Sequence, residues 1–145
     1  MNYPFVPSGA VGGVSPTRAE TSGAIITAFD LVAYDTMGQV VPAISTTASS
    51  IYDVVGVAQT SVLALQTVSV FTLEGLRLPM RFLVAPGAGT NGFPVFLDSS
   101  AGAATLTPPT SSGNTIFRVG ILQGADGVTT TPDVLYRPRY VSQIP

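Results

Sequence analysis

The chain of 145 residues contains no cysteine, histidine, lysine or tryptophan. Without histidine, it has no side chain that ordinarily exchanges protons near neutral pH. Without cysteine, it has no thiolate nucleophile, no sulfur ligand for zinc and no disulfide. Only carboxylates and hydroxyl groups remain for catalysis, so we expect that the chain is not an enzyme and that it holds no cofactor and no metal ion.

Charged residues are scarce. They make up 10% of the chain, against about 25% in ordinary soluble proteins. Six arginines and eight acidic residues give a net charge of −2. A nucleic-acid partner requires a large basic face, which six arginines do not supply, so we expect no nucleic-acid binding.

Long hydrophobic runs are missing too, although the mean hydropathy is positive, at +0.44. The best candidate span, residues 54–71, is interrupted by six glutamine, serine and threonine residues, so we expect no membrane helix and no membrane partner. The first residues show no basic region followed by an apolar core, and so predict no secretory signal. Such an apolar chain is expected to cover its surface with protein neighbours.

What the sequence does contain is a repeat of about 64 residues. Matching residues recur at separations of 63 to 65: Val32 and Val95, Asp35 and Asp98, Gly38 and Gly102, Gly56 and Gly120, and Val70-Phe71 and Leu135-Tyr136. Separations that drift by one residue at a time are expected when short loop insertions lie between preserved strands. The repeat therefore predicts two similar strand units that pack together.

The matched residues have structural and chemical interpretations. Asp35 and Asp98 could form a pair of catalytic carboxylates, but each begins a turn that ends in glycine, so we expect both to cap turns. A calcium site that uses Asp98, Asp126 or Asp133 lacks the regular spacing of oxygen ligands. The Val-Gly pairs at 55–56 and 119–120 lack a glycine-rich run and a lysine, and predict close strand crossings rather than phosphate binding.

Beyond residue 24, β-branched and aromatic residues alternate with turn residues, which predicts strands and no helix. We expect strands at residues 25–35, 39–44, 68–74 and 76–84 in the first copy, and at 94–97, 104–107, 115–122 and 134–137 in the second. Alternation in residues 76–84 places Leu76, Leu78, Met80, Phe82 and Val84 on one face, and Arg77, Pro79 and Arg81 on the other. Pro79 indicates an edge strand.

The predicted fold is all-β: a compact β-barrel or sandwich built from two similar strand units, with an extended N-terminal arm. Residues 1–24 form the arm, residues 25–137 form one β domain with repeats at 25–85 and 91–137, and residues 138–145 form a C-terminal tail. The arm is rich in glycine and proline, and is either disordered or docked on another chain. Its apolar members favour docking: Tyr3, Phe5, Val6, Val11 and Val14.

Arginines and aromatic residues near the termini and on residues 76–84 are candidate interface residues. Guanidinium groups favour interfaces with carboxylates, and aromatic rings serve as anchors. The alternative is an ordinary solvated face. Besides the apolar residues of the arm, the candidates are Arg77, Arg81, Tyr136, Arg137, Arg139 and Tyr140.

The motifs resemble those of a known family. Residues 92–107, 113–122 and 134–138, together with Val40-Val-Pro-Ala and Val54-Val-Gly-Val-Ala, are similar to the β modules of capsid decoration (cement) proteins of tailed bacteriophages. The resemblance covers residues 25–137. It implies a virion protein, made in the bacterial cytoplasm, that binds the outside of the head and ties major capsid subunits together as a homo-oligomer, a trimer or a dimer.

Two other functions remain open. A tail, baseplate or fibre component would share the β module. A carbohydrate-binding module would need an exposed aromatic platform, and the lack of tryptophan counts against it.

Overall fold

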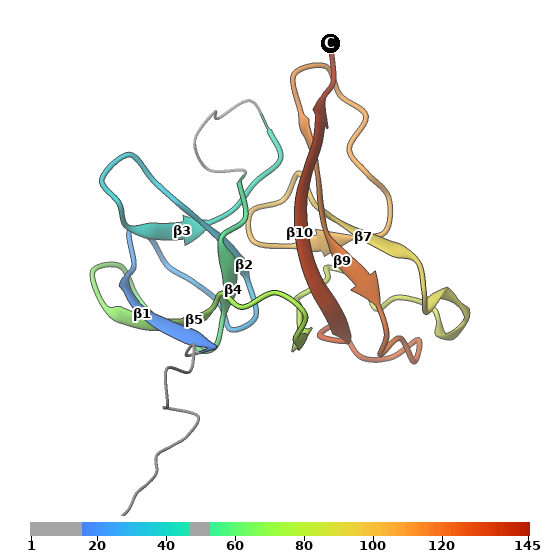
Figure 1. Ribbon diagram of the computed structural model, residues 1–145, viewed down its shortest axis with the longest axis horizontal. Helices are drawn as coiled ribbons and strands as arrows, with labels where there is room; N and C mark the ends of the chain where they lie inside the picture. Colours follow the sequence, from blue (N-terminus) through green and yellow to red (C-terminus); the bar gives the residue numbers. More distant parts are fainter. Residues whose placement is uncertain (1–15, 47–52) are drawn as a thin grey trace, which may run out of the picture.

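The computed structural model describes residues 16–46 and 53–145, in which almost all regular structure is strand (Figure 1). One five-stranded sheet contains β1 (Thr17–Thr21), β2 (Leu31–Tyr34), β3 (Val40–Pro42), β4 (Gly56–Ala58) and β5 (Thr67–Phe71). The other contains β6 (Arg77–Pro79), β7 (Pro94–Leu97), β8 (Ala104–Thr105), β9 (Thr115–Leu122) and β10 (Asp133–Gln143). A short 3-10 helix, η1 (Ala88–Thr90), precedes β7. The predicted all-β class is confirmed. Within the described ranges, no helix is long and apolar enough to cross a membrane.

The two sheets have the same topology. Their strand orders are β1-β5-β4-β2-β3 and β6-β10-β9-β7-β8, so each strand of the first corresponds to the strand five places later in the chain. Each sheet curls, because the segment after its first strand forms a parallel bridge to its last strand, Ser22 to Val40 and Phe82 to Ala104. The prediction of two similar strand units is confirmed. We call them the first unit (β1 to β5) and the second unit (β6 to β10).

Strand pairing corrects the predicted alignment of the two copies at one point. Val57 pairs with Phe71 in the first unit, and Ile121, which follows Val57 by 64 residues, pairs with Leu135 in the second. Phe71 is therefore equivalent to Leu135 and not to Tyr136. The two aromatic rings suggested the wrong match, although the backbone register had not shifted.

The glycine of each Val-Gly pair lies where two strands approach closely, as predicted. A Cβ atom on Gly56 would overlap the carbonyl oxygen of Phe71, and one on Gly120 would overlap that of Leu135. Only glycine fits at these crossings, because a carbonyl oxygen that is held in a ladder cannot move aside.

The two matched aspartates cap turns, as predicted. The Asp35 carboxylate accepts hydrogen bonds from two backbone N–H groups of its turn, each at 2.9 Å, and the Asp98 carboxylate accepts one at 2.7 Å. The glycines that end the turns, Gly38 and Gly102, both adopt φ of +78°, a conformation that glycine reaches without strain. Equivalent residues therefore build equivalent turns.

Three predicted segment boundaries are wrong. β1 lies inside residues 1–24, which were expected to form an arm, and pairs with β5 along its whole length. β6 lies inside the first predicted repeat, residues 25–85, but begins the second unit. The predicted tail, residues 138–145, continues β10 to Gln143. In each case the boundary is set by backbone pairing with a distant strand, which the local sequence does not reveal.

Residues 76–84 follow the predicted alternation only in part. The strand is limited to β6, which is an edge strand, as Pro79 indicated. Leu78, Met80 and Phe82 are buried, but Val84 is 79% exposed. The chain leaves the strand after Pro79 to form the bridge at Phe82, so the period of two no longer orients the residues beyond it.

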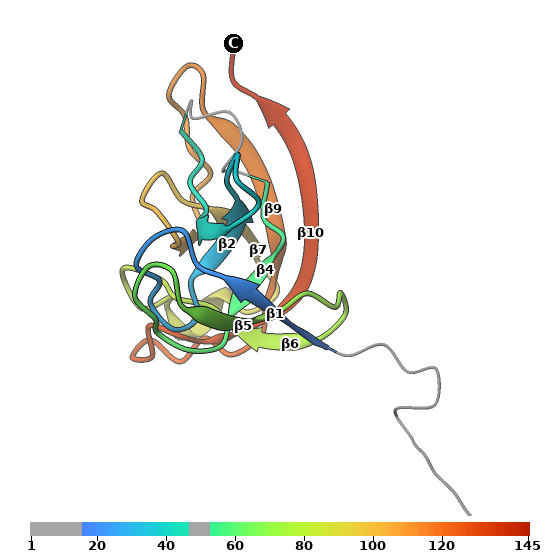
Figure 2. The same ribbon diagram turned by 90° about the vertical axis from the view of Figure 1, so that its left-hand side faces the viewer.

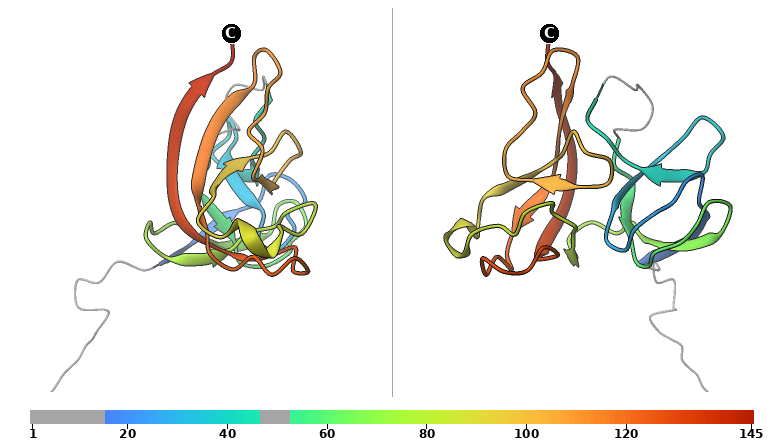
Figure 3. Two further views of the ribbon diagram at one scale, coloured as in Figure 1. Left: turned by 90° about the vertical axis from the view of Figure 1, so that its right-hand side faces the viewer. Right: turned by 180° about the vertical axis from the view of Figure 1, so that it is seen from behind.

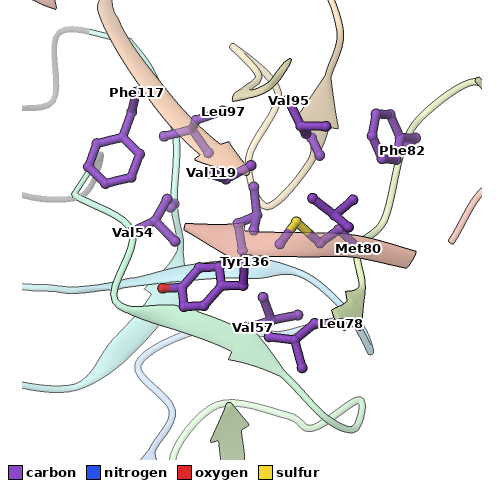
Figure 4. Packing of buried hydrophobic residues seen from close by; sticks show 14 of the residues in the cluster. Val54, Val57, Leu78, Met80, Phe82, Val95, Leu97, Phe117, Val119 and Tyr136 are labelled. Atoms are coloured by element: carbon purple, nitrogen blue, oxygen red, sulfur yellow. The ribbon is translucent and has the colours of Figure 1, made fainter. Parts of the chain in front are cut away.

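The largest group of buried side chains is shared by the two units (Figure 4). The first unit contributes Leu31, Ala33, Ala43, Val54 and Val57, and the second contributes residues of β6 to β10 that include Leu78, Val95, Val119 and Tyr136. Val32 lies between Leu31 and Ala33 on β2 and therefore points the other way, into a smaller core within the first unit. Separating the units would expose the shared core to water.

A buried carboxylate lies at the junction of the units. Asp30 is 2% exposed, and its Oδ1 atom accepts a hydrogen bond from Nε of Arg81 at 2.5 Å. Its Oδ2 atom accepts one from the N–H of Thr27 at 2.9 Å. Arg81 also donates to the carbonyl of Ala101 at 3.0 Å. Burial raises the pKa of the Asp30 carboxyl above its ordinary value, while the Thr27 N–H and Arg81 oppose the shift.

Backbone hydrogen bonds surround this ion pair and join the same two units. The N–H of Leu31 donates to the carbonyl of Gly102 at 2.9 Å, and the N–H of Gly102 donates to the carbonyl of Ala43 at 2.7 Å. A Cβ atom on Gly102 would lie 2.6 Å from the carboxyl carbon of Asp30. The turn that ends in Gly102 thus serves both to reverse the chain and to cover the buried carboxylate.

The close crossing at Gly120 predicts that Gly120→Ala lowers the free energy of unfolding by at least about 2 kcal/mol, because the new Cβ forces two paired strands apart. Urea denaturation measures the change. Gly89→Ala is the matched control, because its Cβ would meet open space, and its effect should be below about 0.5 kcal/mol. Equal effects of the two substitutions would contradict the crossing.

The ion pair predicts a pH-dependent cost for Arg81→Met. At about pH 7 the substitution leaves the ionised Asp30 buried without its cation, and should cost about 1–3 kcal/mol, below the value for a fully buried pair, because the Arg81 side chain is 25% exposed. Loss of the cation raises the pKa of Asp30 further. The variant should therefore regain stability, relative to the wild type, as the pH falls through this pKa toward about 4 and Asp30 takes up a proton.

Arg77→Met is the control for this experiment, because Arg77 forms an exposed ion pair with Asp133 at 3.8 Å. Its cost should be below about 0.5 kcal/mol at both pH values. An Arg81→Met deficit that stays constant, or grows, as the pH is lowered would show that Asp30 is not the group left uncompensated.

Candidate interaction surfaces

The described residues contain no group of three or more histidine, cysteine, aspartate or glutamate side chains that could hold a metal ion. The carboxylates of Asp35 and Asp98 accept hydrogen bonds from backbone N–H groups of their own turns. Two surfaces in this part of the chain carry concentrated charge or exposed apolar side chains.

The predicted interface residues are distributed unevenly. Five lie outside the described residues: Tyr3, Phe5, Val6, Val11 and Val14. Arg77 is exposed and pairs with Asp133. Arg81 is bound by Asp30 at the junction, which corrects the prediction that it faces carboxylates of a partner: its guanidinium compensates a buried acid of its own chain.

Tyr136 is also corrected. Its side chain is 1% exposed and lies in the shared core between Val57 and Val119 (Figure 4). Burial, assisted by the negative charge of Glu74, raises the pKa of the Tyr136 hydroxyl well above its usual range. A ring that packs between the two units cannot anchor an external partner.

Arg137, Arg139 and Tyr140 lie on the part of β10 that extends beyond the shared core, and all three are exposed. Figures 2 and 3 show β10 along the outside of the molecule, with β9 on its inner side. On the side opposite β9, β6 covers β10 only at residues 133–135. Tyr136 also forms backbone hydrogen bonds on that side, with Gly75 and Leu76. Within the described structure, residues 137–143 have no strand partner on that side.

A third arginine joins this surface. Arg139 is directly opposite Arg118 of β9 in the ladder, and Arg118, Arg137 and Arg139 line one hollow of about 130 Å³ together with Ile121. We call these residues the arginine hollow. Arg118 was not predicted as an interface residue, because nothing in residues 115–122 distinguishes it until the register with β10 is known.

The second surface is an apolar tip on the first unit. Leu63 and Leu65 are 61% and 74% exposed in the loop between β4 and β5, and Ile25 beside them is 67% exposed. A hollow of about 260 Å³ adjoins them, whose lining includes Ile26 and Val62 and contains no charged residue. We call Ile25, Leu63 and Leu65 the leucine tip.

Hydrogen bonds to a buried serine hold the leucine tip in place. Ser22 is fully buried. Its hydroxyl donates to the carbonyl of Leu63 at 2.6 Å, and its carbonyl accepts from the N–H of Leu65 at 2.8 Å. The Gln66 side chain accepts from the N–H of Leu63 at 3.0 Å. Leu65 adopts φ of +64°, which costs a leucine about 1–2 kcal/mol.

The leucine tip was not predicted, because its residues belong to an apolar stretch interrupted by polar residues, and nothing in the sequence separates exposed from buried members. Alternation places Leu63 and Leu65 on one face and Ala64 and Gln66 on the other. This pattern is typical of a half-buried strand with its leucines inward, and it does not reveal that both leucines are exposed. Solvent-exposed leucines in a strained, hydrogen-bonded loop are typical of a contact surface.

Comparison of the chain with protein-family models found no matching family, and comparison with curated proteins found no match.

The different positions of Tyr136 and Tyr140 predict different costs of substitution. Tyr136→Ala should lower the free energy of unfolding by about 3–5 kcal/mol, because it opens a cavity in the shared core. Tyr140→Ala should cost less than about 1 kcal/mol, because the ring is 51% exposed. Thermal unfolding followed by circular dichroism measures both. Similar costs would contradict the assignment of Tyr136 to the core.

Proposed function

We propose that this chain is a structural virion protein that binds the outer surface of a bacteriophage capsid and bridges major capsid subunits. The observation that carries the proposal is the leucine tip: an uncharged apolar surface, held in one conformation by Ser22, on a chain that offers little catalytic chemistry. The resemblance of residues 25–137 to decoration proteins gives the partner, the major capsid protein.

The arrangement of the surfaces supports a bridging role. The leucine tip belongs to the first unit and the arginine hollow to the second, and Figure 1 shows the β4–β5 loop and β10 on different halves of the molecule. The shared core and the Asp30–Arg81 pair join the two halves. Two contacts on one stiff body can engage two neighbours at once, and linked contacts give a total affinity well above that of either alone.

The leucine tip supplies the apolar part of such an interface. The backbone of this loop is already held by hydrogen bonds, so binding costs less backbone conformational entropy and more of the free energy of burial is retained as affinity. The proposal includes self-association into a closed oligomer, a trimer by the resemblance, which would multiply the contacts between chain and shell.

The leucine tip predicts that Leu63→Ser combined with Leu65→Ser reduces occupancy on purified phage heads by at least about tenfold, because two apolar anchors are lost from the contact. Gel densitometry of washed particles measures occupancy. Met37→Ser combined with Val128→Ser is the control, since both residues are about as exposed, at 79% and 81%, but lie outside the tip. Equal occupancy of the two double variants would contradict a role for the tip.

The location of the chain on the particle tests the function itself. Antibody labelling of intact phage, viewed by electron microscopy, should place the chain on the head. Labelling confined to the tail would contradict the proposal and favour a tail or fibre component. Retention of the purified chain on a glycan array would favour a carbohydrate-binding module.

A further inference from the structure

Three of the six arginines of the chain have no acidic partner within the described structure, and all three are at one place. Arg18, Arg77 and Arg81 form ion pairs with Glu20, Asp133 and Asp30, respectively. The remaining three line the arginine hollow. In a chain with a net charge of −2, positive charge without a counter-ion is thus concentrated on one outer face of β9 and β10.

The ladder brings these charges closer than random placement would. Arg118 and Arg139 are direct partners in the β9–β10 register, an arrangement that places Cβ atoms about 4.5–5.5 Å apart and that is destabilising for like charges. A register shift between Tyr136 and Arg139 brings Arg139 opposite Arg118, and Arg137, within the shifted segment, lines the same hollow. The isolated chain therefore carries a repulsion that a bound anion would remove.

We propose that the arginine hollow is a binding site for carboxylate groups of an acidic protein segment. All positive side chains of the chain are arginine, whose planar guanidinium binds a carboxylate through two parallel hydrogen bonds. A hollow of about 130 Å³ admits side-chain carboxylates, not a whole cofactor. Ile121 in its lining provides an apolar contact that a peptide can use and a small inorganic ion cannot.

Carboxylates suit this surface better than a nucleic-acid backbone. A polynucleotide requires a row of cations that follows its phosphates, and beyond Arg139 the chain continues to Pro145 with no further arginine. A short acidic segment needs only the three guanidinium groups.

The site rests on the proposed function only for the origin of its partner, which would be an acidic segment of a capsid subunit. Its test uses the purified chain without heads. If the purified chain does not bind the peptide, the arginine site is overturned, but the proposed binding of the chain to heads is not. If the chain is located on the tail, the proposed function is overturned, but the arginine site is not.

Fluorescence anisotropy of a labelled octaglutamate peptide tests the site, in about 50 mM salt so that screening stays weak. The wild-type chain should bind the peptide, and a labelled octaglutamine peptide should not bind. Arg118→Gln combined with Arg139→Gln should weaken octaglutamate binding by at least about tenfold, because two charge-assisted contacts are lost. The same variant should unfold at an equal or higher temperature than the wild type, because the repulsion across the ladder is gone.

The matched control is Arg18→Gln combined with Arg77→Gln, which removes the same charge from exposed arginines outside the hollow. Its octaglutamate affinity should stay within about twofold of the wild type. If both double variants weaken octaglutamate binding equally, the weakening is caused by the change in net charge, and the proposed site is overturned. Tighter binding of a labelled oligonucleotide of eight thymidines than of octaglutamate would overturn the assignment to carboxylates.

Discussion

The Asp30 carboxylate is the point on which the arrangement of the two units depends. It is removed from water, and it is tolerated there because Arg81 comes from the segment after β6 while the Thr27 N–H comes from its own turn. Because the buried carboxylate has hydrogen-bond partners in both units, it keeps all of them only when the two units are in this relative position. The turn at Gly102 can approach only because that residue has no side chain. The shared core then forms on one side of this junction.

The two units have the same backbone topology but carry different residues at the junction between them. The same pair of hydrogen bonds links residues 29 and 30 to Ala58 in the first unit, and residues 92 and 93 to Leu122 in the second. The equivalent of Gly92 is Phe29, and both have positive φ, at +91° and +70°. The equivalent of Asp30 is Phe93, which is 50% exposed. The duplicated fold thus accepts a buried ion at one copy of a position and an exposed ring at the other.

Sequence patterns predicted what is local and repeated. The turns at Asp35 and Asp98, and the crossings at Gly56 and Gly120, were predicted because each is encoded by a few adjacent residues that occur twice. Arg81 and Tyr136 were assigned to an interface because a charge and an aromatic ring look alike in sequence whether or not the fold supplies a partner. The leucine tip depends on Ser22, 41 residues from Leu63, and the arginine hollow depends on a ladder register. Neither contact can be read from neighbouring residues.

β10 is one strand that extends from the shared core to the arginine hollow, with register shifts against β9 between Tyr136 and Arg139 and between Tyr140 and Ser142. Tyr136 lies between the two units, and Arg137 is the first residue outside. β9 accompanies the strand from Val134 to Gln143. A tension applied at the arginines along the strand is therefore carried in shear by a whole row of hydrogen bonds loaded together, instead of one at a time as in unzipping. Because the other end of β10 is buried in the shared core, the force needed to detach the arginine hollow depends on the stability of that core.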